Sequence, residues 1–217
     1  VIGQIVSFTP AAAVRGPKHV VKKGKTPVLT AAEARQLIES IGTDSVVGLR
    51  DRALIATMLY SFARVSAVVG MAVKDYYPQG KRSWIRLHEK GGKFHEVPCH
   101  HKAEEYLDAY LHAAGIREQP KTPLFRSTRG RTSQITEKGL SRIDAFRIVQ
   151  RRAKAAGLLG HICNHSFRAT GITVYLENGG ALETAAHIAA HESPRTTKLY
   201  DRTADNITLE EIERIRF

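Results

Sequence analysis

One segment limits the possible folds more than any other. Residues 47–62, with the sequence VGLRDRALIATMLYSF, are apolar on most faces of a helix. A helix that is hydrophobic nearly all round has to be covered by other elements on every side. We therefore expect a central helix at residues 47–62, in a chain whose 217 residues are enough to bury a sizeable core around it.

The hydrophobic period changes between residues 71 and 98, where the pattern favours strands. Residues 84–88, WIRLH, place Ile and Leu in alternation with Trp, Arg and His, which is typical of a strand. Gly91 and Gly92 follow and predict a two-residue hairpin turn. With a first strand expected at residues 71–77, this region predicts a small antiparallel sheet of three strands.

Helical patterns account for most of the remaining chain. Residues 30–33, T-A-A-E, form a capping box that opens a helix ending near Ile41. Further helices are expected at residues 101–114, 139–156, 166–178, 181–190, 194–201 and 208–216. The expected fold class is therefore α+β and mainly α, with a small three-stranded antiparallel sheet among the helices.

The net charge of +12 favours an acidic partner. Nucleic acid is the stronger candidate and anionic lipid the weaker one, while a charge that serves only solubility is the remaining alternative. No apolar run in the sequence reaches the roughly 18 residues that a membrane-spanning helix needs. Cys99 and Cys163 are too few for a disulfide framework, which fits a reducing cytosol.

Cations and one tyrosine recur in four short segments whose chemistry suits a phosphate. These segments are SFARVS, HEKGGK, NHSFRATG and AAHESPRTTKLYDR. Arginine forks bind phosphate oxygens, and positive charge around the non-bridging oxygens favours phosphoryl transfer. A tyrosine oxygen can take a phosphate covalently. The candidate catalytic residues are Arg64, Lys90, His165, Arg168, His191 and Tyr200.

At these residues the chain resembles the tyrosine recombinase, or phage integrase, family. The pattern combines H-x-x-R at residues 165–168 with His191 and with Tyr200, nine residues after that histidine. Residues 50–66, RDRALIATMLYSFARVS, also resemble the family's first arginine box. The match begins near Leu29, ends at the tyrosine and covers the family's catalytic domain.

One position departs from the family's pattern. The family usually has an acidic residue three positions after the first arginine, and this chain has Ala67 there. The six candidate catalytic residues are all present. The departure therefore concerns only which residues hold the Arg64 side chain and its neighbours in place.

The resemblance implies a role for each candidate residue. Tyr200 would attack a DNA phosphate to give a 3′-phosphotyrosyl link and a free 5′-hydroxyl, so that strands are rejoined with neither ATP nor a metal cofactor. Arg64 and Arg168 would bind the non-bridging oxygens and stabilise the transition state. For Arg64 the alternative is an ordinary ion pair with a carboxylate such as Asp51 or Glu89.

The remaining candidates would handle protons and further phosphate contacts. His165 would help to hold the phosphate and act as a general base toward the tyrosine. His191 would donate a hydrogen bond to the same phosphate. Lys90, beside the predicted hairpin turn, would be the general acid that protonates the leaving 5′-oxygen, and Lys93 is the alternative for that role.

The helix expected at residues 139–156 carries a basic stripe beside its expected core face. The residues at core spacing are Ile143, Phe146, Val149 and Ala153. The basic residues beside them are Arg147, Arg151 and Lys154. With Lys93, this stripe is a candidate for contacts with a DNA backbone, and a solvated face is the alternative.

Metal binding is the competing use of the histidines. His161, Cys163 and His165 form one group with ligand-like spacing, and His187 and His191 form another. Neither group is completed by further ligands at a finger-like spacing, so we expect no structural zinc and no cofactor.

Three parts of the chain are expected. Residues 1–28 are predicted to be the tail and linker of an N-terminal core-binding domain, and residues 29–206 to be the catalytic domain. Residues 208–211, T-L-E-E, form a second capping box. Residues 207–217 are therefore predicted to form a C-terminal helix that docks on a protein surface.

The predicted function is that of a site-specific DNA recombinase or integrase in a bacterial cytoplasm. It would act on double-stranded DNA as a multimer, expected to be a tetramer on paired sites. Two alternatives remain: a type IB topoisomerase, which relaxes supercoils as a monomer with the same chemistry, and a DNA-binding protein with a vestigial site. The short segment after Tyr200 favours a recombinase, and the complete set of six residues argues against a vestigial site.

Overall fold

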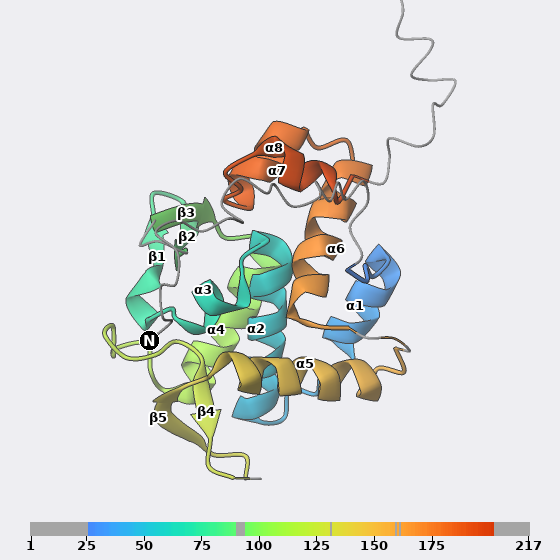
Figure 1. Ribbon diagram of the computed structural model, residues 1–217. Helices are drawn as coiled ribbons and strands as arrows, with labels where there is room; N and C mark the ends of the chain where they lie inside the picture. The colour runs from blue at the N-terminus through green and yellow to red at the C-terminus, as the bar shows by residue number, and fades with distance from the viewer. Residues whose placement is uncertain (1–25, 90–93, 131, 159, 161, 202–217) are drawn as a thin grey trace, which may run out of the picture.

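The computed structural model describes residues 26–89, 94–130, 132–158, 160 and 162–201. Helix α2 (Val46–Ser61) runs through the middle of the domain and packs against α4 (His101–Ala114) and α6 (Asn164–Glu177) (Figure 1). It is buried along nearly its whole length, as a helix apolar on most faces must be. The expected central helix is therefore confirmed.

The end of α2 brings three elements together. Phe62 closes the helix in a left-handed conformation with a φ of 54° and turns the chain toward α3 (Val65–Val69), whose N-cap is Arg64. Gly171 on α6 faces this turn. A Cβ atom at Gly171 would lie 2.3 Å from the carbonyl oxygen of Leu59, so only glycine lets α2 and α6 approach this closely.

The predicted capping box opens α1 (Ala31–Glu39). The Thr30 hydroxyl accepts the Glu33 N–H at 3.2 Å, and the Glu33 carboxylate accepts the Thr30 N–H at 2.8 Å. One residue earlier, the Leu29 N–H donates to the Thr170 hydroxyl of α6 at 2.9 Å. These bonds fix the start of the described chain against α6.

Strands β1 (Tyr76–Gln79), β2 (Arg82–His88) and β3 (Phe94–Pro98) form the predicted antiparallel sheet, in that order. The first strand begins later than the expected residues 71–77, because the 3₁₀ turn η2 (Val73–Asp75) takes up part of that stretch. The Asp75 carboxylate accepts the Ala72 N–H at 2.9 Å and stabilises this turn. The predicted turn at Gly91 and Gly92 lies outside the described residues.

A second, two-stranded sheet was not predicted. It consists of β4 (Arg126–Thr128) and β5 (Ile135–Gly139). Both strands are short and lack clear apolar alternation, so the sequence gives little signal for them. The Arg126 carbonyl accepts Arg50 Nη1 of α2 at 2.8 Å, which joins this hairpin to the start of the central helix.

Helix α5 (Arg142–Ala155) buries a different face from the one predicted at its start. Val149 and Ala153 are buried as expected, but Ile143 and Phe146 are 61% and 43% exposed. The buried residues of α5 are Ala145, Ile148, Val149 and Ala153. Positions 145, 148 and 149 follow the i, i+3, i+4 spacing of one face, and the two exposed residues lie on its neighbour.

Helices α7 (Leu182–Ile188) and α8 (Pro194–Lys198) cover one end of α6 (Figure 1). Helix α8 packs against α7. Helix α7 contributes to a small apolar cluster that is separate from the main core and includes Phe62, Ile172 and Leu176. No helix of the described residues is long and apolar enough to cross a membrane. Residues 1–25 of the predicted N-terminal linker (residues 1–28) and the whole predicted C-terminal helix (residues 207–217) lie outside the described residues.

Candidate active site

Arg168 lies at the junction of α2, α6 and α7. Its side chain is buried and donates to two backbone carbonyls, those of Phe62 and of Ala189, the latter at 2.5 Å. The left-handed turn at Phe62 presents the first of these carbonyls, and the end of α7 presents the second. Arg168 is therefore held by backbone groups from two other elements, as a guanidinium with several donors allows.

Arg64 brings a second positive charge to the same place. Its Nη1 atom forms an ion pair with Glu89 Oε2 at 2.5 Å, while 36% of the Arg64 side chain stays exposed. Burial, the larger cause, and the positive charge of Arg64 together lower the pKa of Arg168 to about 10. Two guanidinium groups thus lie within electrostatic range of each other at the end of α2.

His191 follows α7 and lies within electrostatic range of both arginines. Its Nδ1 atom shares a hydrogen bond of 2.7 Å with the buried Thr197 hydroxyl. Burial lowers the pKa of His191 to about 4, and the positive charges of Arg168 and Arg64 act in the same direction. The imidazole is therefore neutral at neutral pH, with one ring nitrogen able to donate and the other to accept.

Tyr200 follows α8 and stands against His191. The two rings are nearly parallel, with centroids 6.0 Å apart. The backbone of Tyr200 is fixed by its N–H, which donates to the Thr197 carbonyl at 2.9 Å, and by its carbonyl, which accepts from the Thr173 hydroxyl at 3.0 Å. Its phenol interacts with Arg168 and raises the pKa of that guanidinium, although the larger effect of burial lowers it.

The fold thus brings together four of the six predicted catalytic residues: Arg64, Arg168, His191 and Tyr200. His165 lies in the first turn of α6, three residues before Arg168, where it is exposed and its side chain makes no hydrogen bond or ion pair with another described residue. Lys90 and Lys93 lie outside the described residues. Glu89 joins the group as the ion-pair partner of Arg64. The sequence analysis named it, with Asp51, as a carboxylate that Arg64 could bind in place of a phosphate.

The predicted basic stripe of α5 is anchored by a buried acid. Arg147, Arg151 and Lys154 are all exposed, and Arg151 also donates to Asp51 Oδ2 of α2 at 3.0 Å. Arg50 and Arg152 donate to the same carboxylate. Sequence reasoning missed Asp51 in this role, although a charged pair inside a helix apolar on most faces was a usable signal.

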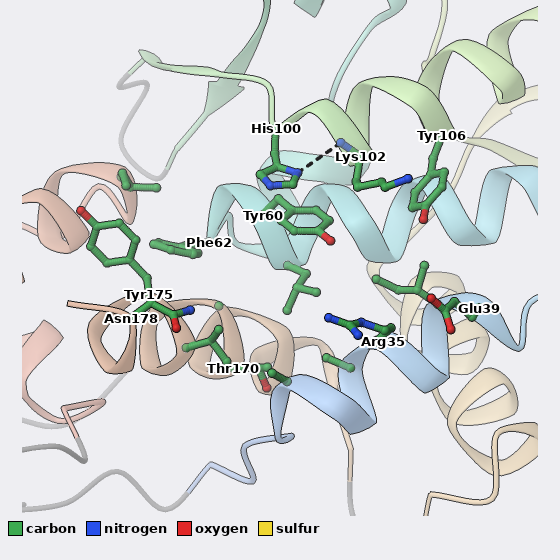
Figure 2. Close-up of a pocket in the computed structure, with 17 residues that line it drawn as sticks. Arg35, Glu39, Tyr60, Phe62, His100, Lys102, Tyr106, Thr170, Tyr175 and Asn178 are labelled. Atoms are coloured by element: carbon green, nitrogen blue, oxygen red, sulfur yellow. Dashed lines mark hydrogen bonds between the residues drawn. The ribbon is translucent and has the colours of Figure 1, made fainter. Parts of the chain in front are cut away.

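A groove of about 650 Å³ opens on the other side of Phe62, between α1, α2, α4 and α6 (Figure 2). The rings of Tyr60 and His100 stack within it at 4.0 Å, and Arg35 and Lys102 add positive charge to its lining. Phe62 is shared between this groove and the site, because its side chain lines the groove while its carbonyl holds Arg168.

No three His, Cys, Asp or Glu side chains of the described residues come together in the manner of a metal site. His161, a member of one of the two ligand-like groups in the sequence, lies outside the described residues.

The chain is similar in sequence to a known family and to known proteins. The sequence pattern of the phage integrase family matches residues 27–206. The tyrosine recombinase XerD of Mycobacterium leprae is 30% identical over 200 residues, covering 90% of this chain and 62% of the relative. The tyrosine recombinase XerC of Pelobacter propionicus is 31% identical over 196 residues, covering 90% and 61%. The chain thus spans about three fifths of the length of these relatives.

Solved structures share the fold. The XerH site-specific recombinase in a pre-cleavage complex with difH has a TM-score of 0.66 at 20% identity, and the match covers 88% of this chain and 54% of that one. A lambda integrase tetramer bound to a Holliday junction has a TM-score of 0.63 at 21% identity, and the match covers 94% of this chain and 55% of that one.

Proposed function

Since the chain belongs to the phage integrase family, we propose that it carries the catalytic site of a site-specific recombinase, which cleaves and rejoins double-stranded DNA. The observation that supports this most is the meeting of Arg64, Arg168 and His191 around Tyr200. Two guanidinium groups and a neutral imidazole beside a phenol supply positive charge, hydrogen bonds and a nucleophile at one place.

The proposed reaction exchanges one phosphodiester for another. The Tyr200 oxygen loses its proton and bonds to the phosphorus, while the bond from phosphorus to the 5′-oxygen breaks and that oxygen gains a proton. Arg64 and Arg168 hold the non-bridging oxygens as charge builds up on them. Attack of a 5′-hydroxyl on the phosphotyrosine reverses the step and rejoins a strand. The new bond is of the same type as the old one, so the reaction as proposed draws on no ATP.

The proton carriers are assigned from the sequence. We propose His165 as the base that receives the phenol proton and Lys90 as the acid that protonates the leaving oxygen, with Lys93 as its alternative. His191 serves as a neutral donor to the phosphate, in keeping with the low pKa that its buried position and the two arginines impose.

We propose that the basic stripe of α5 and the groove beside Phe62 serve DNA binding and assembly. Arg147, Arg151 and Lys154 would lie along a DNA backbone. The groove would receive residues 207–217 of a neighbouring copy in a tetramer on paired sites. Leu209, Ile212 and Ile215 of that segment recur at helical spacing and suit the groove's apolar side chains. Its three glutamates suit Arg35 and Lys102. We propose a bacterial cytoplasmic location, in keeping with this DNA substrate.

An adduct assay separates this function from its two alternatives. The wild-type chain is mixed with a pool of short duplexes of randomised sequence, each carrying a nick that lets the cleaved fragment diffuse away. Protein–DNA adducts that resist SDS are then isolated and their DNA is sequenced. A recombinase captures duplexes that converge on one sequence. Captured sequences without convergence indicate a topoisomerase, and the absence of adducts indicates a DNA-binding protein.

A further inference from the structure

Glu89 contributes a buried carboxylate to the candidate active site. It directly follows β2, and its side chain is only 5% exposed, yet it reaches Arg64 Nη1 at 2.5 Å. Arg64 belongs to a different element, because it caps α3. The ion pair therefore fixes the start of α3 against the end of β2 through a contact that is shielded from water on the carboxylate side.

The charges around this contact explain why a carboxylate is needed there. Arg64 and Arg168 are like charges whose proximity disfavours both being ionised. Glu89 acts on Arg168 in the opposite direction and favours its charged form. The buried negative charge of Glu89 thus offsets part of the repulsion between the two arginines. Without Glu89, a bound phosphate would have to offset that part as well.

Helix α3 itself supplies no such charge. Ala67, the third residue of α3, is fully buried, and its N–H donates to the Arg64 carbonyl at 2.9 Å. An acidic side chain at this third position would reach back toward the N-cap residue, which here is Arg64. A methyl group cannot do so, and the carboxylate comes instead from Glu89, the residue that follows β2.

We propose that Glu89 is a positioning residue that holds Arg64 in its catalytic orientation, in place of an acid at position 67. This inference deepens the proposed recombinase function and rests on it. Glu89 occupies one terminal nitrogen of Arg64. The Nε and Nη2 atoms make no hydrogen bond with the other described residues, and the side chain is more than a third exposed. Glu89 therefore braces the guanidinium and leaves donors for a phosphate.

Single-turnover adduct formation on the nicked DNA pool tests the brace. Glu89→Gln keeps the shape and removes the charge, so the cleavage rate should fall by roughly 10- to 100-fold, the scale of a misplaced catalytic group. DNA affinity should change by less than about two-fold, because a single buried residue adds little to binding by many cations. Glu96→Gln, which removes a carboxylate paired with Arg86 in the same sheet, is the matched control and should cleave normally.

Moving the carboxylate gives a sharper result than removing it. Adding Ala67→Asp to Glu89→Gln returns a negative charge to Arg64 from the other side, and should restore most of the lost rate. Ala67 is fully buried, so the unfolding midpoint of the double variant is measured alongside. If that variant does not fold, Glu89→Asp takes its place as the conservative rescue, and it should cleave faster than Glu89→Gln.

A measurement that needs no activity keeps the inference separate from the proposed function. In ¹⁵N spectra of the arginine side chains, the Nη signals of Arg64, assigned with Arg64→Lys, should be resolved in the wild-type chain and merge in Glu89→Gln as the guanidinium rotates freely. Merged Arg64 signals in the wild type would contradict the positioning role of Glu89. A Glu89→Gln variant that cleaves at the wild-type rate or faster would contradict it too. A wild-type chain with a fixed Arg64 and no adduct contradicts the proposed function alone.

Discussion

At the scale of single residues, Arg168 is the side chain on which most of the site depends. Its guanidinium is buried and spans the carbonyls of Phe62 and Ala189. We expect Arg168→Lys to lower the single-turnover cleavage rate by roughly 10²- to 10³-fold, because an ammonium group cannot serve two carbonyls and a phosphate with the same geometry. DNA affinity should fall far less. A variant that cleaves within a few-fold of wild type would remove Arg168 from the site.

His191 predicts how stability depends on pH. Its pKa in the folded chain, about 4, lies below the ordinary value near 6.5, because burial and two arginines disfavour the charged form. Between these values the unfolded chain binds the proton and the folded chain does not. The contribution of neutral His191 to the stability of the folded chain is therefore complete above about pH 6.5 and is lost as the pH falls toward 4. Denaturant titrations should show this slope in the wild type and a shallower one in His191→Asn, and equal slopes would contradict the assignment.

Residue identity at the site was readable from the sequence, but residue geometry was not. The spacing of His191 and Tyr200 and the motif around Arg168 carried the prediction. The ion pair of Arg64 with Glu89 was one of two alternatives, since it joins residues from α3 and from the end of β2 that only the fold brings together. The exposed position of His165, on the first turn of α6, could likewise not be read from a local pattern.

At the scale of elements, Asp51 ties α2 to α5. This fully buried carboxylate accepts from Arg50, Arg151 and Arg152. We expect Asp51→Asn to lower the free energy of unfolding by about 3–5 kcal/mol, the scale for a buried ion pair that loses one partner. Asp108→Asn is the control, because Asp108 pairs with Arg117 at the surface and should contribute about 1 kcal/mol or less. Equal effects of the two changes in urea unfolding would refute the anchoring role.

The elements with strong periodicity were predicted and the weakly patterned ones were not. The central helix, the capping box of α1 and the three-stranded sheet follow from local signals that agree with the fold. The first strand was placed too early because the Asp75 turn interrupts an apolar stretch. The face of α5 was misassigned at Ile143 and Phe146 because two adjacent faces of that helix both carry apolar residues, and only packing decides between them.

At the scale of the whole molecule, the charge of +12 predicts how DNA binding responds to salt. A protein that neutralises about six phosphates loses roughly 10³-fold in affinity between about 50 and 200 mM salt. We expect a dependence of this kind for the chain, measured by fluorescence anisotropy on a short duplex. Replacing Arg147 and Lys154 together by Gln should lower the slope by about two, one for each lost phosphate contact. An affinity that stays flat as salt rises would contradict an electrostatic DNA surface.

The most direct test of the account asks which atom DNA becomes attached to. Adducts of the wild-type chain with nicked duplex are digested with nuclease and trypsin, and the modified peptide is identified by mass spectrometry. The account predicts a nucleotide joined through its 3′-phosphate to Tyr200, in the peptide LYDR at residues 199–202, and no adduct from Tyr200→Phe. A nucleotide on another residue such as Tyr175, or an adduct that persists in Tyr200→Phe, would contradict it.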